Sequence, residues 1–135
     1  MKKTAIILSI IIIILAIYSY VQRKNKNPKV FYFNGDPNAR FTAITIPPFG
    51  IIINKTAASS PGNTIHTNLV HENVHWKQFQ NIGLPKFYYN YLKYYIESDG
   101  KYQNNPMEQE AFIVSNQYNR INDHILPTNY SGLLA

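Results

Sequence analysis

The segment of residues 5–21 contains 17 consecutive residues without a charged side chain, and most of them are Ile, Leu or Ala. A helix needs about 20 apolar residues to cross the hydrocarbon core of a bilayer, so this segment lies at the short end of the spanning range. It is apolar on every side, whereas a surface helix of a globular domain keeps one polar face. We therefore predict a transmembrane anchor over residues 1–22, followed by a separate domain.

A cleaved signal peptide is the alternative interpretation of this segment. Lys2 and Lys3 fit the charged start of a signal peptide, but the residues after the apolar run, from Tyr18 to Gln22, are too bulky for a cleavage site. We favour an uncleaved, single-pass anchor with membrane lipid as its partner, and Tyr18 and Tyr20 suit the membrane–water interface. Basic residues flank both ends of the segment, so charge does not decide on which side of the membrane the domain lies.

The net charge of +6 belongs to the N-terminal part of the chain. Residues 2–29 hold six of the 13 basic residues and no acidic residue, and residues 23–29 form a basic juxtamembrane linker. Residues 30–135 hold the other seven basic residues and all seven acidic residues, so the domain is neutral and has no basic stripe for nucleic acid. The linker fits either attraction to anionic headgroups or a plain solvated connection.

Residues 71–75 read His-Glu-Asn-Val-His, which is the signature of zinc metallopeptidases. Side chains four residues apart lie on one face of a helix, so His71 and His75 can offer two imidazole nitrogens to one metal ion. Glu72 is close enough to act on a metal-bound water without being a ligand. A helical projection places Gln78 on the face of the two histidines, which we expect to be buried or to line a cleft. A pair of hydrogen-bonded structural histidines is the alternative.

A catalytic zinc ion needs a third protein ligand, and the sequence Asn-Pro-Met-Glu-Gln-Glu-Ala at residues 105–111 contains two candidate carboxylates. Asn105 and Pro106 predict the start of a helix. On this helix Glu108 and Glu110 project about 200° apart, so only one of them can face the metal. Glu108 shares its face with residues that would let two helices approach closely, and we select it as the ligand. A capping box, in which Glu108 returns to its own helix start, is the alternative.

Residues 40–120 resemble the small gluzincin-type zinc metallopeptidase domains, including the minigluzincins. The residues that carry this resemblance are the His-Glu-x-x-His-x-x-Gln motif, the Tyr- and Phe-rich segment after it and the motif Asn-Pro-x-Glu-x-Glu-Ala. The resemblance implies Zn²⁺ as the cofactor, His71, His75 and Glu108 as its ligands, and Glu72 as the general base. It also implies a zincin-like domain, which we place at residues 30–125, with residues 126–135 as a C-terminal tail.

The chain departs from the gluzincin pattern at Phe112. Many gluzincins have an aspartate at this position, four residues after the ligand glutamate, and it often orients a ligand histidine. Such a partner fixes the tautomer and the ring orientation of the histidine. Gln78 and Glu110 are our candidates for residues that orient the metal ligands by hydrogen bonds. Asn119 or a backbone carbonyl are further possibilities.

The pattern of the domain predicts an α+β fold: an N-terminal transmembrane helix followed by a small zincin-like domain with a short β-meander and about three helices. The Tyr- and Phe-rich helix is aromatic on nearly every face, which fits packing, although a tyrosine hydroxyl could serve the site. The expected strands are residues 30–33, 41–46 and 51–54, and the expected helices are residues 64–82, 84–98 and 105–122.

These features together predict a membrane-anchored zinc metallopeptidase that hydrolyses peptide bonds of a peptide or protein substrate. In this mechanism a zinc-bound water is the nucleophile and Glu72 accepts its proton. Residues 41–54 are our candidate for an edge strand that holds an extended substrate. Two alternatives stay open: a non-catalytic, membrane-tethered zinc-binding interaction module, and an anchored structural protein without a metal.

Overall fold

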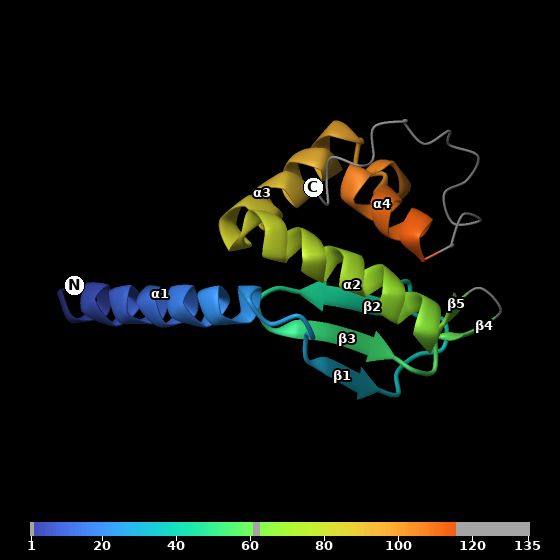
Figure 1. The fold of residues 1–135 in the computed structure, drawn as a ribbon, viewed down its shortest axis with the longest axis horizontal. Coiled ribbons are helices and arrows are strands. Elements are labelled where there is room, and N and C mark those ends of the chain that lie inside the picture. Colours follow the sequence, from blue (N-terminus) through green and yellow to red (C-terminus); the bar gives the residue numbers. More distant parts are fainter. Residues whose placement is uncertain (1, 61–62, 116–135) are drawn as a thin grey trace.

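The computed structural model describes residues 2–60 and 63–115, and the expected end of the last helix, Asn119 and the expected tail lie outside this range. In the described part, a three-stranded sheet and three α-helices follow an N-terminal helix, which confirms the predicted α+β class (Figure 1). The elements are α1 (Lys2–Arg23), β1 (Val30–Phe33), β2 (Ala43–Ile46), β3 (Gly50–Asn54), β4 (Ser59–Ser60), β5 (Asn63–Thr64), α2 (Ile65–Ile82), α3 (Leu84–Glu97), the 3₁₀-helix η1 (Tyr102–Asn104) and α4 (Pro106–Val114).

The sheet has the order β1-β3-β2, with β1 parallel and β2 antiparallel to β3, so the predicted meander is wrong. The chain enters β1 along the edge of β3 that β2 leaves free. Gly50 permits this approach, because its φ is 138° and a Cβ there would collide with the Lys29 carbonyl oxygen. The N–H of Ile51 donates to that carbonyl at 2.8 Å. Ile51 and Ile53 are fully buried, as expected for a central strand.

Local capping signals set the ends of the helices that carry the site. The Thr64 hydroxyl accepts from the N–H of Thr67 at 3.2 Å and begins α2, and Gly83, with φ of 82°, ends it. At the start of α4, the Asn105 side chain accepts from the N–H of Met107 at 2.9 Å, and Pro106 occupies the first turn. The predicted ends of the second helix and the predicted start of the last helix are therefore confirmed.

Helix α2 lies between the sheet and the pair α3 and α4 (Figure 1), and it contacts both sides. One apolar cluster joins α2 to the other helices through Trp76, Phe79, Phe87 and Met107. A second cluster, around Ile51 and Ile53, joins the sheet to the start of α2. Because α2 is covered on two sides, even its polar residues in this central region are buried.

Helix α1 projects from the domain and is long and apolar enough to cross a membrane (Figure 1). The segment after it, which we predicted as a linker, contacts α2 directly. The indole N–H of Trp76 and the side-chain amide of Gln80 donate to the Asn25 carbonyl at 3.0 and 2.8 Å. The junction between α1 and the domain is therefore held by specific hydrogen bonds.

Candidate metal site

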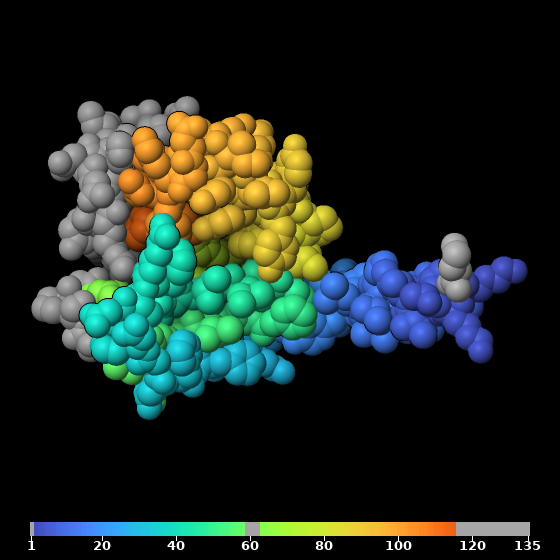
Figure 2. Space-filling model, turned by 180° about the vertical axis from the view of Figure 1, so that it is seen from behind, coloured from blue at the N-terminus to red at the C-terminus, as the bar shows by residue number. Residues whose placement is uncertain are grey.

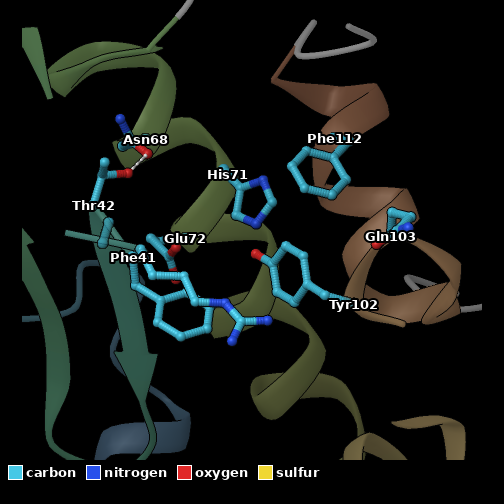
Figure 3. A pocket seen from close by; sticks show the side chains of 10 residues that line it. Phe41, Thr42, Asn68, His71, Glu72, Tyr102, Gln103 and Phe112 are labelled. Carbon is cyan, nitrogen blue, oxygen red and sulfur yellow. Dashed lines mark hydrogen bonds between the residues drawn. The ribbon is translucent and has the colours of Figure 1, made fainter. Parts of the chain in front are cut away.

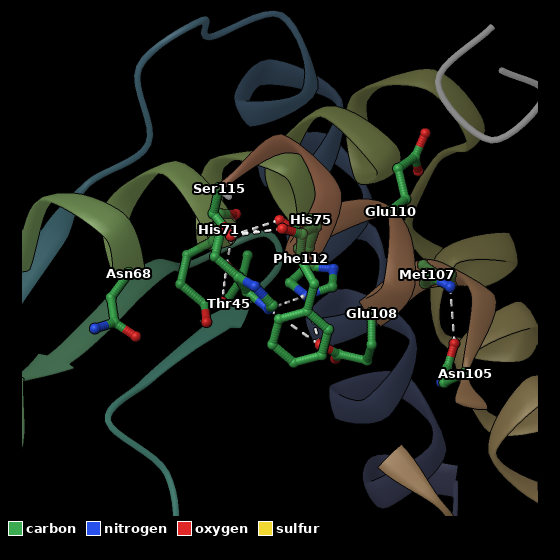
Figure 4. Close-up of polar contacts among 12 residues, drawn as sticks. Thr45, Asn68, His71, His75, Asn105, Met107, Glu108, Glu110, Phe112 and Ser115 are labelled. Carbon is green, nitrogen blue, oxygen red and sulfur yellow. Dashed lines mark hydrogen bonds and ion pairs between the residues drawn. The ribbon is translucent and has the colours of Figure 1, made fainter. Parts of the chain in front are cut away.

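Two turns of α2 and the first turn of α4 bring His71, His75 and Glu108 together (Figure 4). Glu108 Oε2 lies 3.1 Å from His71 Nε2 and 3.3 Å from His75 Nε2, and the two Nε2 atoms are 3.3 Å apart. All three side chains are buried. Three candidate ligand atoms thus converge on one point, and this group could hold a metal ion.

The structure places Glu108, and not Glu110, at the two histidines. The capping box that we considered as the alternative for Glu108 is not formed, because the backbone N–H of Asn105 donates to the Tyr102 carbonyl at 3.1 Å. Glu110 lies on another side of α4 and accepts from the side-chain amide of Gln78 at 2.7 Å. The two carboxylates therefore occupy different positions around α2, as the 200° projection requires.

Behind His75, a chain of hydrogen bonds fixes the tautomer of its ring. The Gln78 amide nitrogen donates to Glu110 Oε2 and, at 3.1 Å, to the Met107 carbonyl, so the amide oxygen must face the other way. This oxygen lies 2.9 Å from His75 Nδ1, which therefore carries a proton and donates. In a neutral ring the lone pair is then on Nε2, which points to Glu108 and His71 and is oriented for a metal.

His71 has a different environment. The Phe112 ring packs on it with ring centroids 4.7 Å apart. Among the described residues, His71 Nδ1 is buried without a hydrogen-bond partner. Phe112 thus gives the His71 ring a contact surface without a hydrogen-bonding group.

Two tyrosines hold the third candidate ligand from the other side. The Tyr91 hydroxyl donates to Glu108 Oε1 at 2.7 Å, which leaves Oε2 directed at the histidines. Burial and the neighbouring Glu108 carboxylate raise the pKa of Tyr91 and of Tyr102. Both hydroxyls therefore remain protonated at neutral pH and serve as hydrogen-bond donors.

The electrostatics of the group favour a positive charge at its centre. Burial alone would lower the pKa of His75, but the Glu108 and Glu72 carboxylates and the Gln78 hydrogen bond raise it to about 9. Burial alone would raise the pKa of Glu108, but the two histidines hold it well below its ordinary value. Without a metal, a proton on His75 supplies the cation that Glu108 requires. A divalent metal ion would supply positive charge in place of this proton.

Glu72 lies beside this group and is held by the sheet. The Thr45 hydroxyl, from the edge strand β2, lies 2.6 Å from Glu72 Oε2 and 2.9 Å from the Glu72 backbone carbonyl, and it can donate to either. Glu72 is 5% exposed. Glu72 lines both cavities that border the site.

A polar cavity of about 230 Å³ lies on the His71 side of the site (Figure 3). Asn68, His71 and Glu72 from α2 form one wall, and Tyr102 and Phe112 form the opposite wall. On the His75 side lies an apolar cavity of about 380 Å³, between β2 and α3. Its lining includes Ile44, Ile46, Phe87, Tyr88 and Tyr91. The site is therefore open to ligands along β2 on both sides of the histidines.

No local sequence pattern identifies Thr45, Tyr91 and Tyr102 as individual site residues. Thr45 belongs to a predicted strand and Tyr91 to a helix that we assigned mainly to packing, with one open role for a tyrosine hydroxyl. Their partners are 27 and 17 residues away in the chain, so no periodic pattern connects them. No protein-family model, curated protein or solved structure matches the chain.

Proposed function

We propose that this protein is a zinc metallopeptidase anchored in the membrane by α1. The observation that carries the proposal is the buried convergence of His71, His75 and Glu108, with Glu72 next to it and a cavity on each side. Two imidazoles and one carboxylate are a donor set of catalytic zinc sites, which keep a fourth position for water or substrate. The tautomer that Gln78 imposes on His75 fits this assignment, because it directs Nε2 to the ion.

A zinc ion held by these residues would supply Lewis-acid activation of a water molecule and of a substrate carbonyl. Glu72 is our general base. Thr45 holds its Oε2 at 2.6 Å, which limits the rotation of the carboxylate and leaves Oε1 to accept the proton of the attacking water. Glu72 then transfers this proton to the nitrogen of the leaving amine. Tyr102 lines the polar cavity and holds the Glu108 carboxylate through its hydroxyl.

The shape of the site supports an extended polypeptide as the substrate. β2 is an edge of the three-stranded sheet and borders both cavities, so its backbone can pair with an added strand. The apolar cavity between β2 and α3 would receive a large apolar side chain next to the bond that is cleaved. This assigns to β2 the role that we expected for an edge strand within residues 41–54.

The test separates metal binding from catalysis. Glu72→Gln in the full-length protein should retain one zinc ion per chain and lose hydrolysis of an unfolded reporter protein, because the amide cannot accept a proton. His71→Ala should lose both. Glu97→Gln is the matched control, because Glu97 is exposed and pairs only weakly with Lys93 at 3.8 Å. If Glu72→Gln cleaves the reporter at the wild-type rate, the proposed mechanism is wrong.

The alternative, a non-catalytic membrane-tethered zinc-binding module, is favoured by one observation. His71 Nδ1 has no partner among the described residues, so this ligand is held less firmly than His75. Under this alternative the wild type binds zinc, yet wild type and Glu72→Gln are equally inactive. A wild type that cleaves the reporter only when zinc is present excludes the alternative.

A further inference from the structure

The domain holds the end of α1 in a fixed position. The Arg23 guanidinium donates to the carbonyls of Gln80 and Asn81, in the last turn of α2, at 2.6 and 2.7 Å. The Gln80 side chain donates back to the Arg23 carbonyl at 3.1 Å. Ser19, about one turn before Arg23, is 8% exposed because the domain covers it. The domain therefore begins at the last turns of α1, without a free linker between them.

The turn between β2 and β3 reaches alongside α1. The ring of Phe49 stacks on the ring of Tyr18, with centroids 6.0 Å apart and an interplanar angle of 28°. Tyr18 lies about 8 Å along the helix from Arg23, inside the uncharged run of residues 5–21. Phe49 is 53% exposed and borders a hollow together with Leu15 and Ile14. If α1 crosses a bilayer, Phe49 lies at the boundary of its hydrocarbon core.

Helix α3 starts beside the last turn of α1, because the Arg23 guanidinium lies against Gly83, the residue before α3. Figure 2 shows α3, in yellow, on the side of the domain from which α1, in blue, projects. On a helical projection its polar residues Lys86, Asn90, Lys93 and Glu97 share one flank. A second, apolar flank carries the residues Tyr88, Tyr89, Leu92, Tyr95 and Ile96, all of which are at least 44% exposed.

This apolar flank of α3 is continuous with the turn that holds Phe49. The Tyr88 hydroxyl donates to the Pro47 carbonyl at 2.6 Å, and Pro47 is two residues before Phe49. Tyr89 is next to Tyr88 on the flank and is 66% exposed. One apolar surface is thus formed by α1, Phe49 and the first turns of α3. It lies beside the end of the uncharged run of α1. Lys24 and Lys26 follow it in the chain, as expected beside anionic headgroups.

We propose that the domain is seated on the bilayer that α1 crosses, through Phe49 and the apolar flank of α3, and that its substrates are polypeptide segments at the membrane surface. Ile46 and Tyr88 line the apolar cavity beside the site. Ile46 is three residues before Phe49, and Tyr88 belongs to the apolar flank of α3. An extended chain emerging from the bilayer therefore reaches β2 without first crossing bulk water. The substrate class rests on the peptidase function proposed above, whereas the seating does not.

The seating is tested with nitroxide labels, because the chain contains no cysteine and each new cysteine is labelled alone. Full-length Phe49→Cys, Tyr89→Cys and the control Asn38→Cys are reconstituted in vesicles of phosphatidylcholine and phosphatidylglycerol. For each label we measure the ratio of its collision rate with oxygen to its collision rate with a water-soluble nickel chelate. We expect this ratio to be at least several-fold higher at positions 49 and 89 than at position 38. If positions 49 and 89 match position 38, the domain stands away from the membrane and the proposal is wrong.

The substrate class is tested with one peptide in two forms, free in solution and attached to a lipid anchor in the same vesicles. We expect wild type to cleave the anchored peptide at least tenfold faster, and Phe49→Ser with Tyr89→Ser to lose this preference without slowing cleavage of the free peptide. Equal rates on both forms would overturn the assigned substrate class. If neither form is cleaved while the labels are membrane-embedded, the peptidase function fails and the seating stands.

Discussion

The hydrogen bonds of Gln78 make it the residue whose replacement tests the metal site most directly. Gln78 is 1% exposed and connects His75, Glu110 and the Met107 carbonyl through bonds of 2.9, 2.7 and 3.1 Å. Gln78→Met keeps the length and fills the space but removes all three. Loss of a residue that orients a ligand histidine typically weakens metal binding about 10- to 100-fold, which corresponds to roughly 1.4–2.8 kcal/mol. We expect a loss of zinc affinity in this range.

The same replacement also destabilises the metal-free protein, because a buried polar group that loses its partner costs about 1–3 kcal/mol. The matched control is Gln80→Met on the same helix, since Gln80 bonds the Arg23 and Asn25 carbonyls and contacts no candidate ligand. Zinc affinity is measured by competition with a chromophoric chelator, and stability by thermal unfolding, for full-length protein in detergent micelles. If Gln78→Met and Gln80→Met bind zinc as tightly as wild type, Gln78 does not orient a metal ligand.

Two further predictions concern the charge balance of the site. In the metal-free protein, the contribution of His75 to stability should be complete below its ordinary pKa of 6.5 and lost as the pH rises through about 9, whereas that of Glu108 should be lost as the pH falls below about 4.5. Denaturant titrations of chelator-treated protein at several pH values should show this decline, and stability that does not change with pH would contradict the pairing. Zinc affinity should rise over the same alkaline interval, because zinc competes with the proton for His75. Tyr91→Phe should weaken zinc binding several-fold and lower stability by about 1–2 kcal/mol, because it removes the 2.7 Å bond to Glu108 and keeps the ring. Tyr94→Phe, on the same helix, is the control, and equal zinc affinities of the two variants would refute a role for Tyr91 in holding the ligand.

The parts of the molecule that were predictable from sequence are those with local signals. Thr64 and Gly83 mark the ends of α2 through their own backbone and side-chain geometry. The spacing of four between His71 and His75 sets their common face, and the angular separation on α4 allows only one of Glu108 and Glu110 to face them. Each of these inferences uses residues within a few turns of one another, where helix geometry alone determines the arrangement.

The parts that were not predictable depend on contacts between distant segments. The parallel pairing of β1 with β3 depends on the close approach of the Lys29 carbonyl to Gly50, which a strand pattern does not encode. The hydrogen bond of Thr45 to Glu72 joins residues 27 positions apart. A threonine in a strand and a tyrosine in an aromatic helix have many possible partners, so only the assembled fold identifies the one they use.

The position of Glu108 in the first turn of α4 also affects how the chain assembles. The short helix α4 docks on α2 around His71, His75 and Glu108, at the centre of their contact, and not around apolar side chains alone. Bringing a carboxylate to two imidazoles in a dry interior is unfavourable until a cation compensates it. In the metal-free protein a proton on His75 provides this cation, so α4 can close over α2 before a metal arrives. Zinc uptake would then displace this proton from a site that is already assembled.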